Sequence, residues 1–223
     1  ILVTGAAGYI GGTFAYEALN KGISVFGIDN FLNSTKRNID ILEKKFPKEF
    51  KFLELDISEK KNDLKKAVCS FMPDVVVHFA GLKAVGEAEE KPELYWKNNV
   101  NSTLNILDSI NPNIPIIFSS SATVYGQNEL QPLTEKTPLS TTSVYGQTKI
   151  ASENLIKEYS KLKEYKGICL RYFNPVGSHN DCIISENFNN KPNNLMPKLI
   201  ETVMNGQNKI SIFGNDYKTK DGT

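Results

Sequence analysis

The sequence predicts an α/β protein built on a doubly wound parallel sheet. Apolar runs of strand length alternate with helical patterns over roughly the first 170 residues. Glycines directly follow the first apolar run and open the first helical pattern. The run Val75–Phe79 is almost purely apolar, which is typical of a parallel strand covered on both faces. Such alternation gives a parallel sheet with helices on both sides, the Rossmann type.

The first three strand–helix pairs follow from apolar runs and from helical spacing. Apolar residues at positions 10, 14 and 18 recur at the spacing of one helix face. An Asp-Ile-Ser turn separates the third strand from its helix. The expected elements are strand Ile1–Thr4, helix Gly8–Lys21, strand Ile23–Ile28, helix Ser34–Lys45, strand Phe50–Leu55 and helix Glu59–Ser70.

The next three strands are separated by two long helices. One helix runs from about Pro92 to Ile110 and begins on a proline, which suits a first helical turn. It is followed by strand Ile114–Phe118, helix Val144–Lys163 and strand Gly167–Tyr172. For the second long helix the spacing predicts an inward face made of Val144, Thr148, Ala151, Leu155, Tyr159 and Leu162.

The alternation breaks after Asn174. Residues 179–194 are polar and without periodicity, which indicates a loop. A helix over Leu195–Asn205 and a short strand over Lys209–Phe213 are expected beyond it. We therefore predict a complete first domain over 1–173 and the beginning of a smaller second domain over 174–223, truncated before its core is complete.

Composition narrows the possible partners. The chain has 223 residues, 40% of them hydrophobic, with 26 basic against 25 acidic residues, so nothing favours a nucleic-acid or membrane-surface partner. No apolar stretch approaches the ~20 residues that span a bilayer. Three cysteines without a C-x-x-C spacing argue against a disulfide or a zinc site. We expect a cytoplasmic protein without a bound metal.

The glycines Gly5, Gly8 and Gly11 have the spacing of a phosphate-binding loop. They stand between a strand and a helix, where tight turning and close backbone approach to a pyrophosphate are needed. The helix N-terminus favours the negative charge. An ordinary strand-to-helix turn is the alternative explanation, but the flanking strand and helix favour dinucleotide binding. The domain over 1–173 is thus predicted to bind a nicotinamide dinucleotide.

Asp29 lies at the end of the second predicted strand, 18 residues after Gly11. A carboxylate there can accept hydrogen bonds from the adenosine ribose and repels a 2′-phosphate, so NAD is preferred over NADP. Asp56 and Ile57 follow the third strand, where such folds contact adenine; Asp56 also suits a plain helix N-cap.

Tyr145 and Lys149 lie four residues apart on one face of a predicted helix. A neighbouring ammonium, together with a positive nicotinamide ring, can lower the pKa of a phenol from ~10 toward neutrality. Ser121 follows a strand, where its hydroxyl can bridge a substrate hydroxyl and the phenol. A Y-x-x-x-K spacing also occurs by chance in helices. With the glycine loop upstream, it predicts a proton-handling group beside the cofactor.

With these residues in place, the chain closely resembles the UDP-glucose 4-epimerase (UDP-galactose 4-epimerase) family of the extended short-chain dehydrogenases/reductases. The likeness runs from Ile1 to Thr223. It rests on the strings Val3–Gly11, Asp29-Asn30, His78–Glu87, Phe118–Gly126, Leu170–Gly177, Asn193–Pro197 and Ile212–Tyr217. His78, within one of them, is expected to be a packed core histidine.

The resemblance implies an isomerase of galactose metabolism that binds NAD and recycles it. Tyr145 would take the proton from the 4-hydroxyl of UDP-galactose or UDP-glucose with help from Ser121, C4 would give up hydride, and the transient 4-keto sugar would turn and regain hydride on its other face. Lys149 would hold the nicotinamide ribose. The family also implies a homodimer, formed through the helices around Pro92–Ile110 and Val144–Lys163.

The resemblance further implies two sets of binding residues. Those for the cofactor are Gly5, Gly8, Tyr9, Ile10, Gly11, Asp29, Asn30, Asn33, Ser34, Asp56, Ile57, Phe79, Ala80, Gly81, Lys83, Asn98, Ser119, Tyr145, Lys149 and Tyr172. Those for the UDP-sugar are Lys83, Ser121, Ala122, Thr123, Tyr145, Phe173, Asn174, Asn194, Leu195, Ile212 and Phe213. Several of these residues also have a purely structural explanation: Phe79–Gly81 can end a strand, and Asn194 can form a turn.

Three departures from the family pattern stand out. Ala6-Ala7 and Gly12 replace more usual residues but are small enough for the turn, and Lys218 stands at a common proline position. The arginines that grip the UDP diphosphate in this family would fall after Thr223, and neither Arg37 nor Arg171 matches them.

Other functions stay open at this point. A nucleotide-sugar 4,6-dehydratase shares the loop, the tyrosine and the lysine but needs an Asp-Glu pair where Ala122 and Thr123 stand. A UDP-glucuronate epimerase or decarboxylase needs a pocket for the C6 carboxylate. A non-catalytic NAD-binding protein would commonly lack the tyrosine or the lysine, and both are present.

Overall fold

The computed structural model describes residues 1–128, 132–181, 183–184, 194–207, 209–212, 214–217, 220 and 222. The chain divides into two compact units, Ile1–Asn189 and Asn190–Thr223, which we describe separately. The predicted domain boundary after residue 173 stays a prediction.

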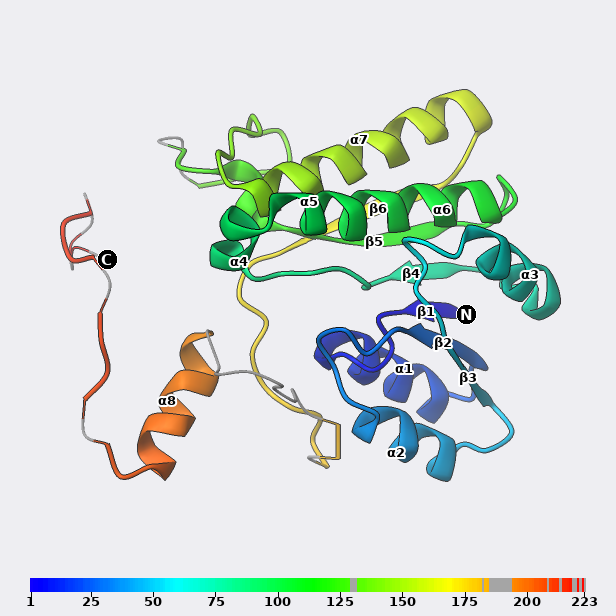
Figure 1. The fold of residues 1–223 in the computed structure, drawn as a ribbon, viewed down its shortest axis with the longest axis horizontal. Helices are drawn as coiled ribbons and strands as arrows, with labels where there is room; N and C mark the ends of the chain where they lie inside the picture. The colour runs from blue at the N-terminus through cyan, green and yellow to red at the C-terminus, as the bar shows by residue number, and fades with distance from the viewer. Residues whose placement is uncertain are drawn as a thin grey trace. The chain divides into compact units, whose positions relative to one another are not determined.

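A six-stranded sheet forms the centre of the first unit (Figure 1). Its strands are β1 (Leu2–Thr4), β2 (Val25–Asp29), β3 (Phe50–Glu54), β4 (Val76–His78), β5 (Ile116–Ser121) and β6 (Gly167–Tyr172). All pairs are parallel, in the order β3-β2-β1-β4-β5-β6. This order reverses direction between β1 and β4, so a crevice is expected at the carboxyl ends of these strands. The predicted Rossmann-type fold is confirmed.

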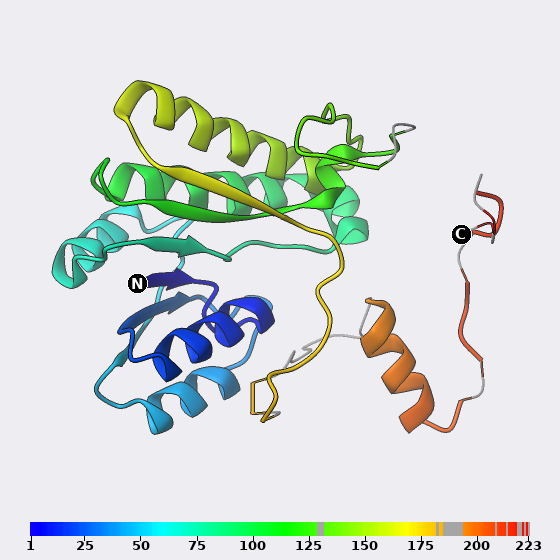
Figure 2. The same cartoon turned by 180° about the vertical axis from the view of Figure 1, so that it is seen from behind.

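Helices cover both faces of this sheet. On one face lie α1 (Tyr9–Asn20) and α2 (Arg37–Lys45), and on the other lie α3 (Lys61–Phe71), α6 (Asn101–Ser109) and α7 (Val144–Lys163) (Figures 1 and 2). Two short helices, α4 (Val85–Glu90) and α5 (Pro92–Tyr95), and a π-helical turn η1 (Trp96–Val100) lead into α6. A 3₁₀ turn, η2 (Ala122–Tyr125), follows β5.

Each face of the sheet has its own buried cluster. The cluster under α3, α6 and α7 includes Leu64, Ile106, Ile116 and Ile156, each at most 2% exposed. The cluster under α1 and α2 includes Tyr16 and Leu42, both fully buried. Such burial contributes about 1.5–3 kcal/mol for each large apolar side chain, so the sheet is a rigid base for the loops at its carboxyl edge.

Most predicted elements match the structure. Helix α7 and strand β6 have the predicted bounds, and the long helix predicted from Pro92 is interrupted by the π turn η1. The predicted strand over 209–213 is wrong, because residues 209–212 form no strand and residue 213 lies outside the described residues. Residues 209–212 take part in none of the described strand ladders, so no pairing stabilises an extended segment there.

The predicted inward face of α7 is confirmed except at its end. Thr148 is buried and Val144, Leu155 and Tyr159 pack against buried clusters, but Leu162 is 79% exposed. Lys149 and Ser152 are also buried, although the spacing did not predict it. These polar side chains point inward because they bond to groups on β5, η1 and α6, and such bonds outweigh the lack of apolar surface.

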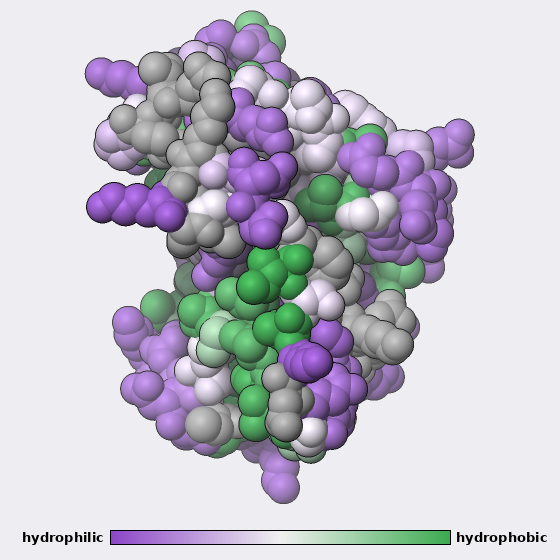
Figure 3. Space-filling view, turned by 90° about the vertical axis from the view of Figure 1, so that its left-hand side faces the viewer, coloured by the Kyte–Doolittle hydropathy of each residue, from purple (hydrophilic) through white to green (hydrophobic). Residues whose placement is uncertain are grey.

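The second unit contains α8 (Leu195–Met204), where the sequence predicts a helix. Its large apolar side chains are mostly exposed, Met204 at 81% and Val203 at 74%. Exposed apolar side chains are visible at the surface in Figure 3. Among the residues that the structure describes, no helix combines the length and the apolar character needed to cross a bilayer.

Candidate active site

The glycine loop between β1 and α1 is held in a conformation that excludes side chains. Gly5 has a φ of +71°, and a Cβ there would lie 2.7 Å from the backbone nitrogen of Ala80. A Cβ on Gly11 would lie 2.2 Å from the carbonyl oxygen of Gly5. Gly8, the N-cap of α1, has more room, with 3.3 Å to the same oxygen. Two of the three glycines are therefore required by packing alone.

The first turn of α1 is suited to an anion. Its N-cap Gly8 has no side chain to satisfy the free N–H groups, and no acidic residue stands in that turn. Free N–H groups and the helix dipole together favour a phosphate at this position. Tyr9 and Ile10 lie half-buried in the same turn, and the Tyr9 hydroxyl donates to the carbonyl of Gly177 at 2.5 Å. The loop thus fits the pyrophosphate of a dinucleotide.

Asp29 ties this loop to the end of β2. Its Oδ2 accepts a hydrogen bond from the backbone N–H of Ala7 at 3.0 Å. Its Oδ1 accepts from the N–H of Phe31 at 2.9 Å and from the hydroxyl of Ser34 at 3.0 Å. An ionised carboxylate has about four acceptor positions, so one on Oδ2 is left for a ribose hydroxyl. Asp29 therefore holds the glycine loop through Ala7 and keeps one acceptor position for a ligand.

Asn30 and Asp56 form the next pair along this edge. The Asn30 amide donates to Asp56 Oδ2 at 3.1 Å, while Asp56 Oδ1 accepts from the N–H and the hydroxyl of Ser58 at 2.9 and 2.6 Å. Partial burial raises the pKa of Asp56, but the hydrogen bonds from Ser58 and Asn30 outweigh it and hold this pKa below its usual value. Ile57 beside it is buried and Asn33 is exposed.

The segment after β4 passes between the glycine loop and α7. Phe79, Ala80 and Gly81 are half-buried, and Lys83 is exposed. A Cβ on Gly81 would lie 3.5 Å from the Nζ of Lys149, so this segment contacts the predicted proton-handling group directly.

Asn99, which the sequence analysis did not single out, fixes that segment in place. Its Oδ1 accepts from the N–H of Leu82 at 2.8 Å, and its amide donates to Leu82 O and to Thr148 Oγ1, both at 3.1 Å. The π turn η1 places Asn99 inward and leaves the predicted Asn98 half-buried. A π turn within a helix is frequently found at functional sites, but a single sequence gives no sign of it.

Tyr145 opens α7 and faces the end of β5. The hydroxyl of Ser121 lies close enough to the phenol to influence its pKa. Burial raises the pKa of Tyr145, and the Ser121 hydroxyl opposes this only in part. Lys149 lies 5.8 Å from the ring centroid of Tyr145. The sequence predicts that this ammonium and a positive nicotinamide ring together lower the pKa of Tyr145, which for the protein with NAD bound stays a prediction.

Lys149 lies one turn further along α7 and is 5% exposed. Its Nζ donates to the carbonyl oxygen of Ser119 at 2.9 Å and lies 4.9 Å from the ring centroid of Phe118. Burial lowers the pKa of Lys149 to about 8, while the charge of Glu153 raises it. The ammonium form is still favoured at neutral pH.

His78 is a packed core histidine, as predicted. It is fully buried, with Nδ1 2.7 Å from the Thr4 hydroxyl and Nε2 3.2 Å from the Thr103 hydroxyl. Burial, and then the charge of Lys149, lower the pKa of His78 to about 3. The imidazole is therefore neutral and serves as a hydrogen-bonding support between β1, β4 and α6.

The predicted substrate residues lie in three places. Ser121, Ala122 and Thr123 are half-buried at the end of β5, where the Ser121 hydroxyl donates to Thr123 Oγ1 at 2.9 Å. Phe173 and Asn174 are exposed after Tyr172. The remainder belong to the second unit, where Asn194, Leu195 and Ile212 are exposed; Phe213 lies outside the described residues.

Comparisons with known proteins identify the family of the chain. Residues 1–222 match the family described as "NAD dependent epimerase/dehydratase family". The whole chain is 42% identical to a UDP-glucose 4-epimerase of Erwinia amylovora and 40% identical to one of Bacillus subtilis, covering 67% and 66% of their lengths. The chain thus spans about two thirds of these relatives.

Solved structures give the same result. A crystal structure of a UDP-glucose 4-epimerase from Bifidobacterium longum in complex with NAD+ and UDP matches with a TM-score of 0.91 and 38% identity, over 100% of this chain and 67% of that one. One from Stenotrophomonas maltophila, with bound NAD and formylated UDP-arabinopyranose, matches with a TM-score of 0.92 and 32% identity, with the same coverage.

Proposed function

The chain belongs to the NAD dependent epimerase/dehydratase family, and on that premise we propose that it is an isomerase that interconverts UDP-galactose and UDP-glucose at C4 with bound NAD. The observation that carries the proposal is the meeting of Ser121, Tyr145 and Lys149 at the carboxyl end of β5, on the same edge of the sheet as the glycine loop. Relatives at about 40% identity that carry the name UDP-glucose 4-epimerase support the reaction type.

The glycine loop and Asp29 hold the adenosine half of NAD in this proposal. Gly5, Gly8 and the first turn of α1 receive the pyrophosphate, and the remaining acceptor of Asp29 receives a ribose hydroxyl. Asn30, Asp56 and Ile57 lie where the adenine ring is expected. Bound NAD supplies a reversible acceptor for the hydride from C4.

Tyr145 takes the proton of the sugar 4-hydroxyl and later returns it, and Ser121 orients that hydroxyl against the phenol. Because burial raises the pKa of Tyr145, a positive charge close to the ring is needed for the phenolate to form near neutral pH. Lys149 contributes part of that charge and anchors the ribose next to it. The 4-keto sugar then presents its other face.

The same residues disfavour a 4,6-dehydratase. Elimination of water from C5–C6 needs an acid and a base next to Ser121, and η2 supplies Ala122 and Thr123 there. Neither residue can transfer protons in that way. A UDP-glucuronate epimerase or decarboxylase would need a cationic or hydroxyl-rich pocket for the C6 carboxylate and is the weaker alternative.

Three further assignments belong to this proposal. Asn194, Leu195, Ile212 and Phe213 of the second unit contact the UDP-sugar. The protein is cytoplasmic, in keeping with the free thiols of Cys69 and Cys169. It forms a homodimer through the helices on the α6–α7 face, where Trp96 is 43% exposed. A monomer found by light scattering would contradict the homodimer.

The reaction is tested by incubating the purified protein with UDP-galactose and no added NAD. We expect proton NMR to show UDP-glucose appearing until the two sugars reach equilibrium. A 4-keto-6-deoxy sugar as the product would instead support a dehydratase. Retained NAD without any turnover would support a non-catalytic NAD-binding protein.

A further inference from the structure

Three successive turns of α7 face three consecutive residues of β5. Tyr145 lies beside Ser121, and the Nζ of Lys149 donates to the carbonyl of Ser119. One turn further, Glu153 Oε1 accepts from the hydroxyl of Ser120 at 2.5 Å. Tyr145 and Lys149 belong to the proposed chemistry, whereas Glu153 extends the same row without a role in it.

Glu153 is also paired with Arg171 on β6. Arg171 donates from Nε to Oε1 at 3.0 Å and from Nη2 to Oε2 at 2.7 Å, a two-point contact. The side chains are 9% and 19% exposed. Arg171 Nη1 donates in turn to the Tyr125 hydroxyl at 2.9 Å. The carboxylate of Glu153 on α7 therefore bonds to β5 and β6, and Arg171 links it further to η2.

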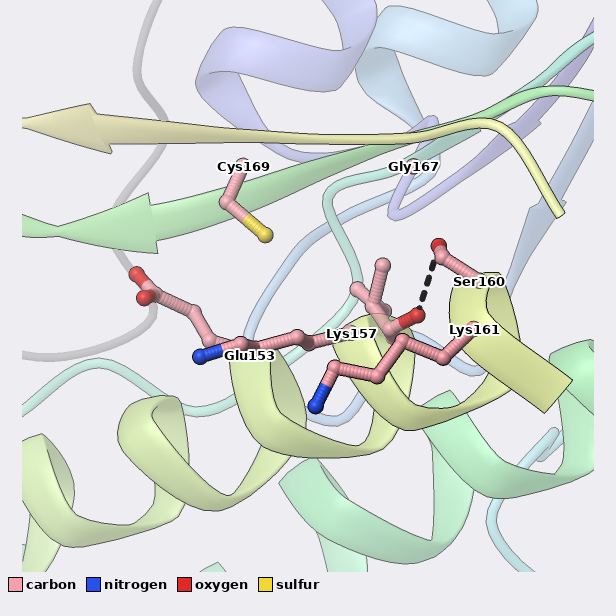
Figure 4. Close-up of a pocket in the computed structure, with 7 residues that line it drawn as sticks. Glu153, Lys157, Ser160, Lys161, Gly167 and Cys169 are labelled. Carbon is pink, nitrogen blue, oxygen red and sulfur yellow. Dashed lines mark hydrogen bonds between the residues drawn. The ribbon is translucent and has the colours of Figure 1, made fainter.

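A shallow groove between α7 and β6 ends at this pair. In Figure 4, Glu153 and Cys169 lie at one end of the groove, while Gly167 and Ser160 lie at the other. At the Gly167 end the helix and the strand are in close contact, since a Cβ there would lie 2.3 Å from Cγ2 of Ile156. Glu153 lies at the opposite end, one turn of α7 from Lys149.

The surroundings of Lys149 explain why a charge at Glu153 matters. A buried ammonium is costly unless an anion stands close by. The groups that face it are the phenol of Tyr145, the neutral His78 on β4, the Ser119 carbonyl on β5 and the carboxylate of Glu153 on its own helix. Arg171 on β6 and Tyr125 on η2 act on it through Glu153. Among the described residues, Glu153 is therefore the anion whose charge raises the pKa of Lys149.

We propose that Glu153 is a positioning residue: held by Arg171 and Ser120, it fixes α7 on β5 and β6 and keeps the Lys149 ammonium charged beside Tyr145. The proposal rests on the function proposed above. It differs from a merely structural role because the charge of Glu153, not just its shape, sets the protonation of Lys149. Arg171 has the opposite effect on the protonation of Lys149, because its positive charge offsets the negative charge of Glu153.

The test compares Glu153→Gln with Arg171→Gln. The protein is labelled with carbon-13 at the lysine ε position, the Lys149 signal is assigned by its absence in Lys149→Arg, and NMR titration gives the pKa of Lys149. The pH profile of kcat with UDP-galactose is measured in parallel. Glu158→Gln removes an exposed carboxylate from the same helix and serves as the matched control.

Glu153→Gln is expected to lower the pKa of Lys149 and to move the basic limb of the kcat profile to lower pH. Arg171→Gln is expected to move both in the opposite direction, and Glu153→Asp to stay near the wild type. Structural damage would move both Gln variants the same way, so equal directions overturn the proposal. An unchanged Lys149 pKa in folded Glu153→Gln overturns it too.

Circular dichroism checks that each variant folds. If Glu153→Gln does not fold, Arg171→Gln decides: a raised Lys149 pKa supports the proposal and a lowered one overturns it. Loss of the fold in both variants would assign the pair a purely structural role and also overturn it. Absence of epimerisation by the wild type contradicts the proposed function, whereas the NMR titration still tests Glu153.

Discussion

The two sides of the crevice in the first unit are built in different ways. On the β1–β2 side the site consists of backbone and small residues: Gly5 and Gly11 leave no room for a Cβ, and Asp29 holds the loop by accepting N–H bonds. On the β5–α7 side it consists of buried ionisable side chains, Tyr145, Lys149 and Glu153. In the proposed function the first side binds the cofactor through close backbone approach, whereas the second places ionisable groups next to the reacting atoms.

This difference predicts how each side responds to substitution. Changes on the glycine side should affect cofactor binding and folding, with chemistry altered only as a consequence. Changes on the α7 side should affect turnover and pH dependence while the cofactor stays bound. The four predictions below test this division, from the largest expected effect to the smallest.

Tyr145→Phe should lower kcat by about a hundred- to ten-thousandfold, because it removes the group that carries the proton. NAD should remain bound, since the hydroxyl makes no described contact with the glycine loop. Steady-state kinetics and the absorbance of bound NAD measure the two effects. Tyr159→Phe, on the same helix but bonded to Asp108, should stay within about twofold of the wild type. A Tyr145→Phe enzyme with the wild-type rate would contradict proton transfer by Tyr145.

Lys149→Met should raise stability at pH 7 by up to about 3 kcal/mol. Burial lowers the pKa of Lys149 from 10.5 to about 8, so between these values the unfolded chain holds a proton that the folded chain has lost. Wild-type stability therefore rises with pH across that window, and the advantage of the variant shrinks. Urea unfolding at pH 7, 8, 9 and 10 measures this. Lys157→Met changes an exposed lysine of the same helix, so its plot of stability against pH should run parallel to that of the wild type. A parallel plot for Lys149→Met as well would contradict a buried ammonium at Lys149.

Gly11→Ala should destabilise the protein by about 1–3 kcal/mol and weaken NAD binding, because its methyl group would overlap the Gly5 carbonyl. Gly86→Ala is the matched control. Nothing lies within 4 Å of a Cβ there, and alanine is the better helix former in α4. Thermal unfolding and NAD titration give both quantities. Equal behaviour of the two variants would show that the loop tolerates a side chain.

Asp29→Asn should weaken NAD binding by about tenfold, since one acceptor becomes a donor beside the N–H of Ala7. Discrimination against NADP should also fall, because the carboxylate charge that repels a 2′-phosphate is gone. The ratio of the two dissociation constants, measured by calorimetry, tests this. Asp40→Asn, an exposed carboxylate on α2, should leave the ratio unchanged; if Asp29→Asn does the same, the carboxylate does not select the cofactor.

The glycine side was predictable from the sequence to the level of single residues. Steric requirements act over a few neighbours, so the spacing of Gly5, Gly8 and Gly11 and the place of Asp29 after β2 give the local geometry. The bounds of α7 and β6 were predictable for the same reason. Apolar periodicity missed the buried Lys149 and Ser152 of α7, where polar bonds to β5 and α6 replace apolar contacts.

The electrostatics of the α7 side were not predictable. The Glu153–Arg171 pair joins residues 18 positions apart on a helix and a strand, and no local spacing indicates it. The raised pKa of Tyr145 depends on burial, which the Tyr145–Lys149 spacing does not report. The π turn that brings Asn99 inward likewise follows from packing against Thr148.

The central claim is that hydrogen leaves C4 and returns to it without passing into solvent, while Tyr145 moves only the hydroxyl proton. UDP-galactose carrying deuterium at C4, incubated with the purified protein in ordinary water, tests this directly. Mass spectrometry of the UDP-glucose formed should find the deuterium retained at C4. Loss of the deuterium to water during conversion would contradict the account.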